Sequence, residues 1–150
     1  QDKAISVADR LENESEPCLI IGADTVVAFE GKILGKPSDE EDALDTLLKL
    51  QGKSHQVYTG VTLIEVCTDG SLREKSFYEE TNVHVCQMTK DEIASYVATG
   101  EPLDKAGAYG IQGTFSIYVS GIEGDYFNVV GLPVSRLYHE FASFQNVAHK

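Results

Sequence analysis

Three segments of the sequence combine polar side chains with glycine in a way that suits a charged ligand. The first, residues 22–25 (GADT), follows a short apolar run and places the carboxylate of Asp24 where a strand is expected to end. Sites in open α/β sheets gather beyond the carboxyl ends of strands, so a carboxylate there is well placed for function. The segment on its own is nevertheless more typical of an ordinary Asp turn. The second, residues 35–37 (GKP), holds Lys36 between a flexible and a rigid residue, and a solvated loop lysine has the same pattern.

The third segment, residues 101–113 (EPLDKAGAYGIQG), is richer in chemistry. Its three glycines permit close approach of the backbone to a ligand. Lys105 supplies a cation, and Gln112 supplies an amide that can both donate and accept hydrogen bonds. The segment has neither the GxxxxGK[ST] pattern of a P-loop nor the GxGxxG of a dinucleotide-binding fold. These residues alone leave a nucleotide or phosphate site and an ordinary loop equally open.

Other chemistries have less support. A zinc site is disfavoured because no HExxH or paired-ligand spacing occurs among the histidines, which are His55, His84, His139 and His149. Serine–histidine catalysis lacks a GxSxG elbow. Paired-carboxylate glycosidase chemistry remains open, with no specific pattern in its favour.

Composition sets wider limits. A chain of 150 residues fits one domain, expected over 1–150, with one sizeable core. The net charge of −12 disfavours a nucleic-acid partner, because that binding is driven by clustered Lys and Arg. A membrane span is not expected either, since no apolar run approaches roughly 20 residues. An odd number of cysteines without CxxC spacing, Cys18, Cys67 and Cys86, favours reduced thiols and a cytoplasmic setting.

The elements expected to position these side chains in the first half of the chain are a helix and several strands. Residues 3–12 have the spacing of an amphipathic helix. Residues 18–21 (CLII) are typical of a strand buried on both faces, ending at Gly22, and residues 26–29 form a second apolar run. Further on, residues 57–67 and 73–87 predict two strands, which the pair Asp69 and Gly70 joins in a hairpin.

Helices are indicated by their caps. Ser38 with Glu41, and Thr89 with Glu92, have the spacing of capping boxes at the start of two helices. Residues 117–122 and 126–130 are typical of strands, and a last helix is expected to begin near Pro133. We expect Tyr118, Tyr126 and Phe127 in the core rather than at an interface. The alternation of strands and helices predicts an α/β fold with a mixed sheet.

Taken together, six segments resemble the Maf (septum formation protein) family in their order and spacing. They are residues 21–27 (IGADTVV), 33–37 (ILGKP), 55–61 (HQVYTGV), 77–81 (FYEET), 100–113 (GEPLDKAGAYGIQG) and 124–133 (GDYFNVVGLP). The resemblance covers nearly the whole chain. It implies a Maf/ITPase-like fold, in which helices flank a mixed, twisted sheet, and a homodimer.

The resemblance also implies an activity and a site. A Thr at position 25 and a Gln at position 112 mark the dTTP/UTP branch of nucleoside triphosphate pyrophosphatases, which release a monophosphate and pyrophosphate. Asp24 would accept the proton of a water attacking the α-phosphorus. The triphosphate would be lined by family lysines, matched here by Lys36, Lys105 and, less securely, Lys3. A divalent cation, Mg²⁺ or Mn²⁺, is implied as cofactor, and Asp24 is its expected ligand instead of, or as well as, acting as base.

One departure leaves alternatives open. Family members begin with a strand and a loop reading roughly LASxSPRR, whose Ser and Arg hold phosphates, and this segment does not precede Gln1. We therefore expect one strand and part of the phosphate site to be missing from the chain, and an inactive chain is one alternative. The others are a non-catalytic nucleotide-binding or regulatory domain and a pyrophosphatase for a modified purine nucleotide such as 7-methyl-GTP.

Overall fold

A computed structural model describes residues 18–147 except 68 and 70. Its centre is a five-stranded sheet in the order β2-β1-β3-β4-β5. The strands are β1 (Cys18–Phe29), β2 (Lys32–Leu34), β3 (Ser54–Val66), β4 (Leu72–Val85) and β5 (Val119–Glu123). All four pairings are antiparallel. The α/β class with helices flanking a twisted sheet is confirmed, whereas the described strands contain no parallel pairing of the kind a mixed sheet requires.

β1 is one continuous strand rather than two apolar runs separated by a turn. It pairs with β3 from Cys18 to Ala28 without interruption, so the expected break at Gly22 does not exist. The prediction that residues 18–21 are buried on both faces is also wrong, since Leu19 and Ile21 are 37% and 47% exposed. The long partner strand β3 keeps the polar GADT segment extended, because pairing supplies hydrogen bonds that a local turn would otherwise provide.

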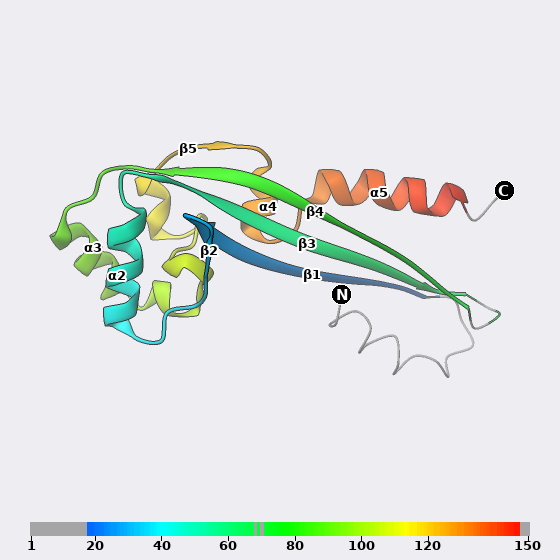
Figure 1. Cartoon of the computed structure of the whole chain (residues 1–150), viewed down its shortest axis with the longest axis horizontal. Coiled ribbons are helices and arrows are strands. Elements are labelled where there is room, and N and C mark those ends of the chain that lie inside the picture. Colours follow the sequence, from blue (N-terminus) through cyan, green and yellow to red (C-terminus); the bar gives the residue numbers. More distant parts are fainter. Residues whose placement is uncertain (1–17, 68, 70, 148–150) are drawn as a thin grey trace.

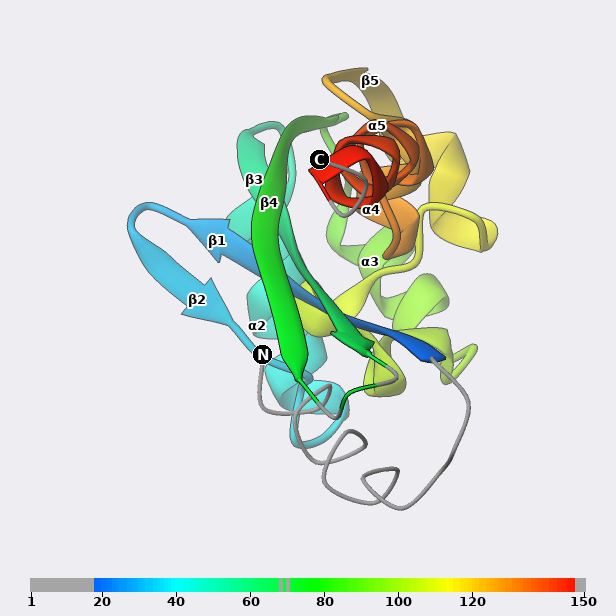
Figure 2. The same ribbon diagram turned by 90° about the vertical axis from the view of Figure 1, so that its right-hand side faces the viewer.

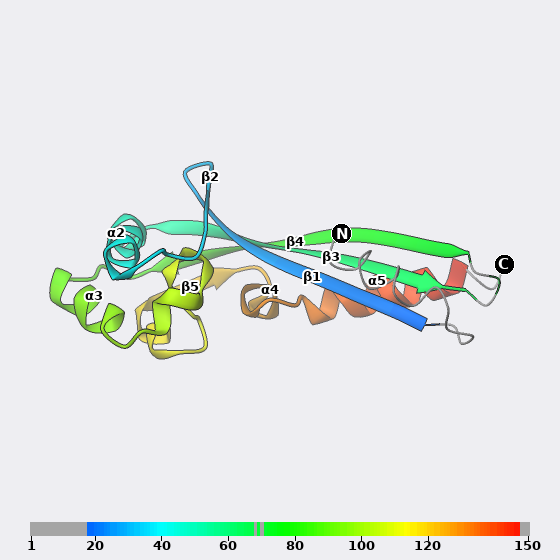
Figure 3. The same ribbon diagram turned by 90° about the horizontal axis from the view of Figure 1, so that it is seen from below.

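β3 and β4 form the expected hairpin and run the length of the molecule (Figure 1). Alternation places Thr81, Val83 and Val85 on the core side of β4, and all three are buried. Figure 3 shows the short β1–β2 hairpin turning away from the rest of the sheet.

Two helices, α2 (Glu40–Leu50) and α3 (Lys90–Val97), pack together at one end of the sheet (Figure 1). The capping box of α3 is confirmed, with Thr89 and Glu92 exchanging hydrogen bonds. The one expected for α2 is wrong. Asp39, not Ser38, caps this helix, because its carboxylate accepts the N–H of Asp42 at 2.9 Å.

The chain closes with α4 (Tyr126–Val130) and α5 (Val134–Val147). The expectation of a strand over 126–130 is wrong. The carboxylate of Asp125 accepts the N–H of Phe127 at 2.8 Å and so begins a helical turn, which Gly131 ends. Tyr126 and Phe127 are 40% and 51% exposed, so they lie outside the core. Tyr118 is partly buried against it, as expected.

The main core lies between the sheet and α2, α3 and residues 101–118. The other half of the sheet is covered on one side by α5, as Figure 2 shows from the end of the molecule. There the guanidinium of Arg73 lies 4.4 Å from the ring centre of Phe144, and Lys75 Nζ lies 2.6 Å from Glu140. Among the described residues, no helix has the length and apolar character needed to cross a membrane.

Candidate active site

A cavity of about 640 Å³ opens at the edge of β1, within the size range of small-molecule sites. Its walls come from β1, the connection between β2 and α2, residues 101–113 and the end of α4. The residues predicted to form the site meet here, because the cavity is lined by Asp24, Thr25, Lys36, Lys105 and Gln112. Lys3 lies outside the described residues.

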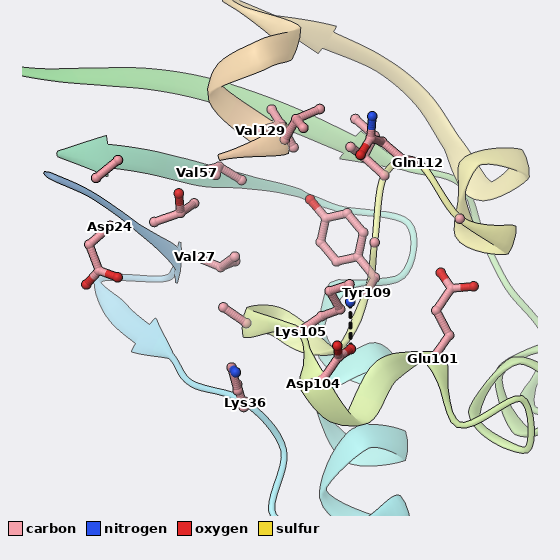
Figure 4. A pocket seen from close by; sticks show the side chains of 17 residues that line it. Asp24, Val27, Lys36, Val57, Glu101, Asp104, Lys105, Tyr109, Gln112 and Val129 are labelled. Carbon is pink, nitrogen blue, oxygen red and sulfur yellow. Dashed lines mark hydrogen bonds and ion pairs between the residues drawn. The ribbon is translucent and has the colours of Figure 1, made fainter. Parts of the chain in front are cut away.

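Asp24 does not occupy the strand end that its sequence context suggests. It lies in the middle of β1, paired with Gly60 of β3, and its side chain is exposed. An ideal Cβ on Gly60 would meet nothing within 4 Å, so the backbone beside Asp24 is open. In Figure 4, Asp24 and Lys36 lie on one side of the cavity, and Gln112 lies on the opposite side.

The two lysines act on a common carboxylate. Lys105 Nζ donates a hydrogen bond of 2.6 Å to Asp104. This bond lowers the pKa of Asp104, and the charge of Lys36 is a smaller cause in the same direction. Asp104 is a cavity residue that the sequence analysis did not single out, and Lys105 contacts it directly.

The loop of residues 101–113 is held against β1 by a close backbone approach. Gly107 N donates to Gly35 O at 3.1 Å, which joins the loop to the segment that carries Lys36. Gly107 has a φ of +72°, and an ideal Cβ on it would lie 3.0 Å from Val27. Any side chain at this position would push the loop away from β1 and disturb the placement of Lys105.

Glu101 fastens the other end of the same loop. Its carboxylate accepts the hydroxyl of Tyr96 at 3.0 Å and the N–H of Thr114 at 3.1 Å. Burial is the first cause that raises the pKa of Tyr96, and the bond to Glu101 adds to it. The phenol consequently stays protonated as a donor, which fixes the loop from α3.

Tyr109 forms part of the cavity wall and is 5% exposed. Its hydroxyl is 2.8 Å from Nε2 of the fully buried His55. Burial, followed by the charge of His84, lowers the pKa of His55 to about 4. Glu101 and Tyr109 were missed from the sequence because their positions depend on side chains from distant elements.

The lowered pKa of His55 predicts an acid-dependent loss of stability. The unfolded chain takes up a proton near pH 6.5 and the folded one only near pH 4, so the free energy of unfolding falls as the pH drops through this window. The loss attributable to His55 amounts to about 3 kcal/mol. Urea unfolding of the wild type and of His55→Gln at several pH values measures it as a difference in slope.

The matched control is His139→Gln, because His139 is exposed on α5. It should keep the wild-type slope. An unchanged slope in His55→Gln would contradict the assignment.

Few of the described side chains are grouped in a way that would bind a metal ion. Within residues 18–147 other than 68 and 70, no group of three or more His, Cys, Asp or Glu side chains could hold a metal ion. Asp24 offers carboxylate oxygens, the ligands that Mg²⁺ prefers. Such an ion commonly takes one or two carboxylates together with oxygens of the substrate phosphates, and this arrangement fits the residues present.

The cavity combines the exposed carboxylates of Asp24 and Asp104 with two lysines and with the amide of Gln112. The family model described as Maf-like protein matches residues 1–144. The chain belongs to the Maf family. Three of the segments that resemble this family, residues 21–27, 33–37 and 100–113, contribute residues to the cavity wall.

Curated relatives are similar over most of the chain. A protein of Agathobacter rectalis, named dTTP/UTP pyrophosphatase, is 58% identical over 122 residues, which are 81% of this chain and 60% of that protein. Proteins with the same name from Carboxydothermus hydrogenoformans and Bacillus cereus are 55% and 50% identical, over 93% and 98% of this chain. The matches span 72% and 73% of those two proteins.

Proposed function

We propose that this protein is a nucleoside triphosphate pyrophosphatase that hydrolyses dTTP and UTP to the monophosphate and pyrophosphate. The observation that carries the proposal is the meeting of Asp24, Lys36, Lys105 and Gln112 around one cavity. The relatives named dTTP/UTP pyrophosphatase support the choice of substrate.

The proposed reaction is an attack of water on the α-phosphorus. Asp24 accepts a proton from the water as its oxygen forms the new bond to phosphorus. The bond between the α-phosphorus and the oxygen bridging to the β-phosphate breaks, and its electron pair leaves with pyrophosphate. Lys36 and Lys105 stabilise the negative charge that moves onto the phosphate oxygens.

The division of the cavity supports an orientation for the substrate. Asp24 and Lys36 lie on one side, where the triphosphate would bind, and Gln112 lies on the other with Val129 (Figure 4). The amide of Gln112 can donate to a pyrimidine carbonyl and accept the ring N–H. A base without this pair of groups would leave the amide unpaired and bind less tightly.

The proposal is tested by measuring pyrophosphate release from a panel of dTTP, UTP, dCTP, dGTP and 7-methyl-GTP with Mg²⁺. We expect dTTP and UTP to be cleaved with the highest kcat/KM. Preference for 7-methyl-GTP would reassign the substrate. Binding of dTTP without release of pyrophosphate would indicate a nucleotide-binding domain instead of an enzyme.

We also propose that the enzyme uses Mg²⁺ or Mn²⁺, held by Asp24 and by substrate phosphates. The ion would neutralise phosphate charge and orient the triphosphate. Treatment with EDTA is expected to lower the rate at least about tenfold, and added Mg²⁺ or Mn²⁺ should restore it. An EDTA-resistant rate would contradict the metal requirement.

We also propose that the protein forms a homodimer and acts in the cytoplasm. The exposed apolar side chains of Tyr126 and Phe127, next to each other on α4, are consistent with a surface that a second copy covers. Analytical ultracentrifugation should give twice the mass of one chain. A monomer at micromolar concentration would contradict this part.

A further inference from the structure

One carboxylate in the cavity wall is engaged by the protein itself. Glu101 accepts a hydrogen bond at each of its two oxygens, from the hydroxyl of Tyr96 at 3.0 Å and from the N–H of Thr114 at 3.1 Å. The Tyr96 hydroxyl in turn accepts the N–H of Gly110 at 3.3 Å. Glu101 is therefore connected, directly or through Tyr96, to both ends of residues 110–114.

The direction of each bond follows from its chemistry. A backbone N–H only donates, so the phenol oxygen accepts from Gly110 and its single proton points at Glu101. The carboxylate accepts at both of its ends. In Glu101→Gln the side chain has one oxygen and one NH2 group, so it could accept from only one of the two donors. The network thus requires a carboxylate and not only a polar side chain.

Gly113 provides the space that this carboxylate occupies. An ideal Cβ on Gly113 would overlap Oε1 and the carboxyl carbon of Glu101. The φ of Gly113 is −92°, a value that any residue adopts, so glycine is required here by space and not by backbone conformation. The residue directly after Gln112 is therefore packed against Glu101.

The network fixes the turn that carries Gln112 to the core. Gly113 N donates to Gly110 O at 3.1 Å, which closes a turn with the exposed Gln112 as its third residue. Tyr96 of α3 is 2% exposed, and its ring centre lies 5.1 Å from that of the fully buried Phe115. An exposed turn without such an anchor would sample many backbone conformations.

Electrostatics and position argue against contact between Glu101 and the triphosphate. A second negative charge beside the phosphates would repel them. In Figure 4, Glu101 lies on the same side of the cavity as Gln112, away from Asp24 and Lys36. Its place in the cavity wall is therefore explained by the turn that it holds.

We infer that Glu101 is a positioning residue that holds Gln112 toward the nucleotide base. The inference rests on the proposed function, in which Gln112 contacts the base. Glu101 and Tyr96 act through the turn and do not touch the nucleotide. Ordering the turn before the substrate binds reduces the entropy that binding must overcome, so losing Glu101 should weaken the base contact more than the chemical step.

The test compares kcat/KM for dTTP and for N3-methyl-dTTP, which has no ring N–H, in the wild type, Glu101→Gln and Tyr96→Phe. The preference for dTTP should fall by about three- to tenfold in both variants, the scale of one hydrogen bond. The value for N3-methyl-dTTP should change much less. Tyr96→Phe keeps the ring that packs against Phe115, so it tests the network even if Glu101→Gln does not fold.

A double-mutant cycle gives a readout that a general loosening of the structure would not produce. In Gln112→Ala the amide is already absent, so adding Glu101→Gln should leave the preference between the two nucleotides unchanged. An effect of Glu101→Gln on the preference that adds to that of Gln112→Ala would overturn the inference.

Two control variants match the chemistry of the tested ones. Glu41→Gln removes a charge from an exposed residue of α2 outside the cavity wall. Tyr118→Phe removes a hydroxyl from a ring that lies 5.7 Å from Phe115, as the ring of Tyr96 lies against the same residue. Both should keep the wild-type preference, and thermal unfolding checks the fold of every variant.

The outcomes separate this inference from the function on which it rests. Cleavage of dTTP by the wild type, with an unchanged preference or equal losses on both nucleotides in Glu101→Gln and Tyr96→Phe, would overturn the inference alone. Absence of any dTTP cleavage by the wild type would overturn the proposed function and the inference with it.

Discussion

Replacing Asp24 by Asn should lower kcat for dTTP by a factor between about a hundred and ten thousand, the range over which a positioned general base contributes. Asn keeps the size of the side chain and removes its ability to accept a proton from water. Because Asp24 is exposed and lies in a strand paired along its length, the variant should fold normally. Steady-state pyrophosphate release measures kcat, and thermal unfolding checks the fold.

The matched control is Asp45→Asn. Asp45 is exposed on α2 and does not line the cavity, so its loss of charge should leave kcat unchanged. Near-normal turnover of Asp24→Asn would refute the role of Asp24 as base. A loss in Asp24→Asn that excess Mn²⁺ largely repairs would instead favour the metal-ligand role.

Replacing Gln112 by Ala should reduce the preference for dTTP over N3-methyl-dTTP by at least about tenfold, because the hydrogen bond to the ring N–H, which only dTTP offers, is lost. Binding of the triphosphate should change less, since Lys36 and Lys105 lie elsewhere in the cavity wall. The ratio of kcat/KM for the two nucleotides measures the effect. Gln145→Ala, on the exposed side of α5, is the control. An unchanged ratio in Gln112→Ala would show that the base binds elsewhere.

Features encoded by neighbouring residues could be predicted from the sequence. The capping box of Thr89 and Glu92 depends on four consecutive residues, and the hairpin between β3 and β4 depends on a local turn pattern and alternation. The candidate site residues were found because they lie in motifs shared with a family. Their meeting around one cavity follows from the sheet and from the docked loop of residues 101–113.

Features that depend on distant partners were missed. The GADT segment has the composition of a turn, but eleven residue pairs with β3 keep it extended. Residues 126–130 are apolar enough for a strand, and short apolar runs of this kind do not distinguish strand from helix. The hydrogen bond between the hydroxyls of Thr25 and Thr59 could not be predicted either, because it joins side chains of two strands that are far apart in the sequence.

The length of the sheet has a practical consequence for handling this protein. The end of β3 at Val66 and the start of β4 at Leu72 lie at the opposite end of the sheet from α2 and α3 (Figure 1). The loop of residues 101–113 and the β2–α2 connection, which line the cavity, belong to the end with the helices. A biosensor surface or fluorescent reporter attached at the hairpin end would therefore leave the mouth of the cavity facing free solution.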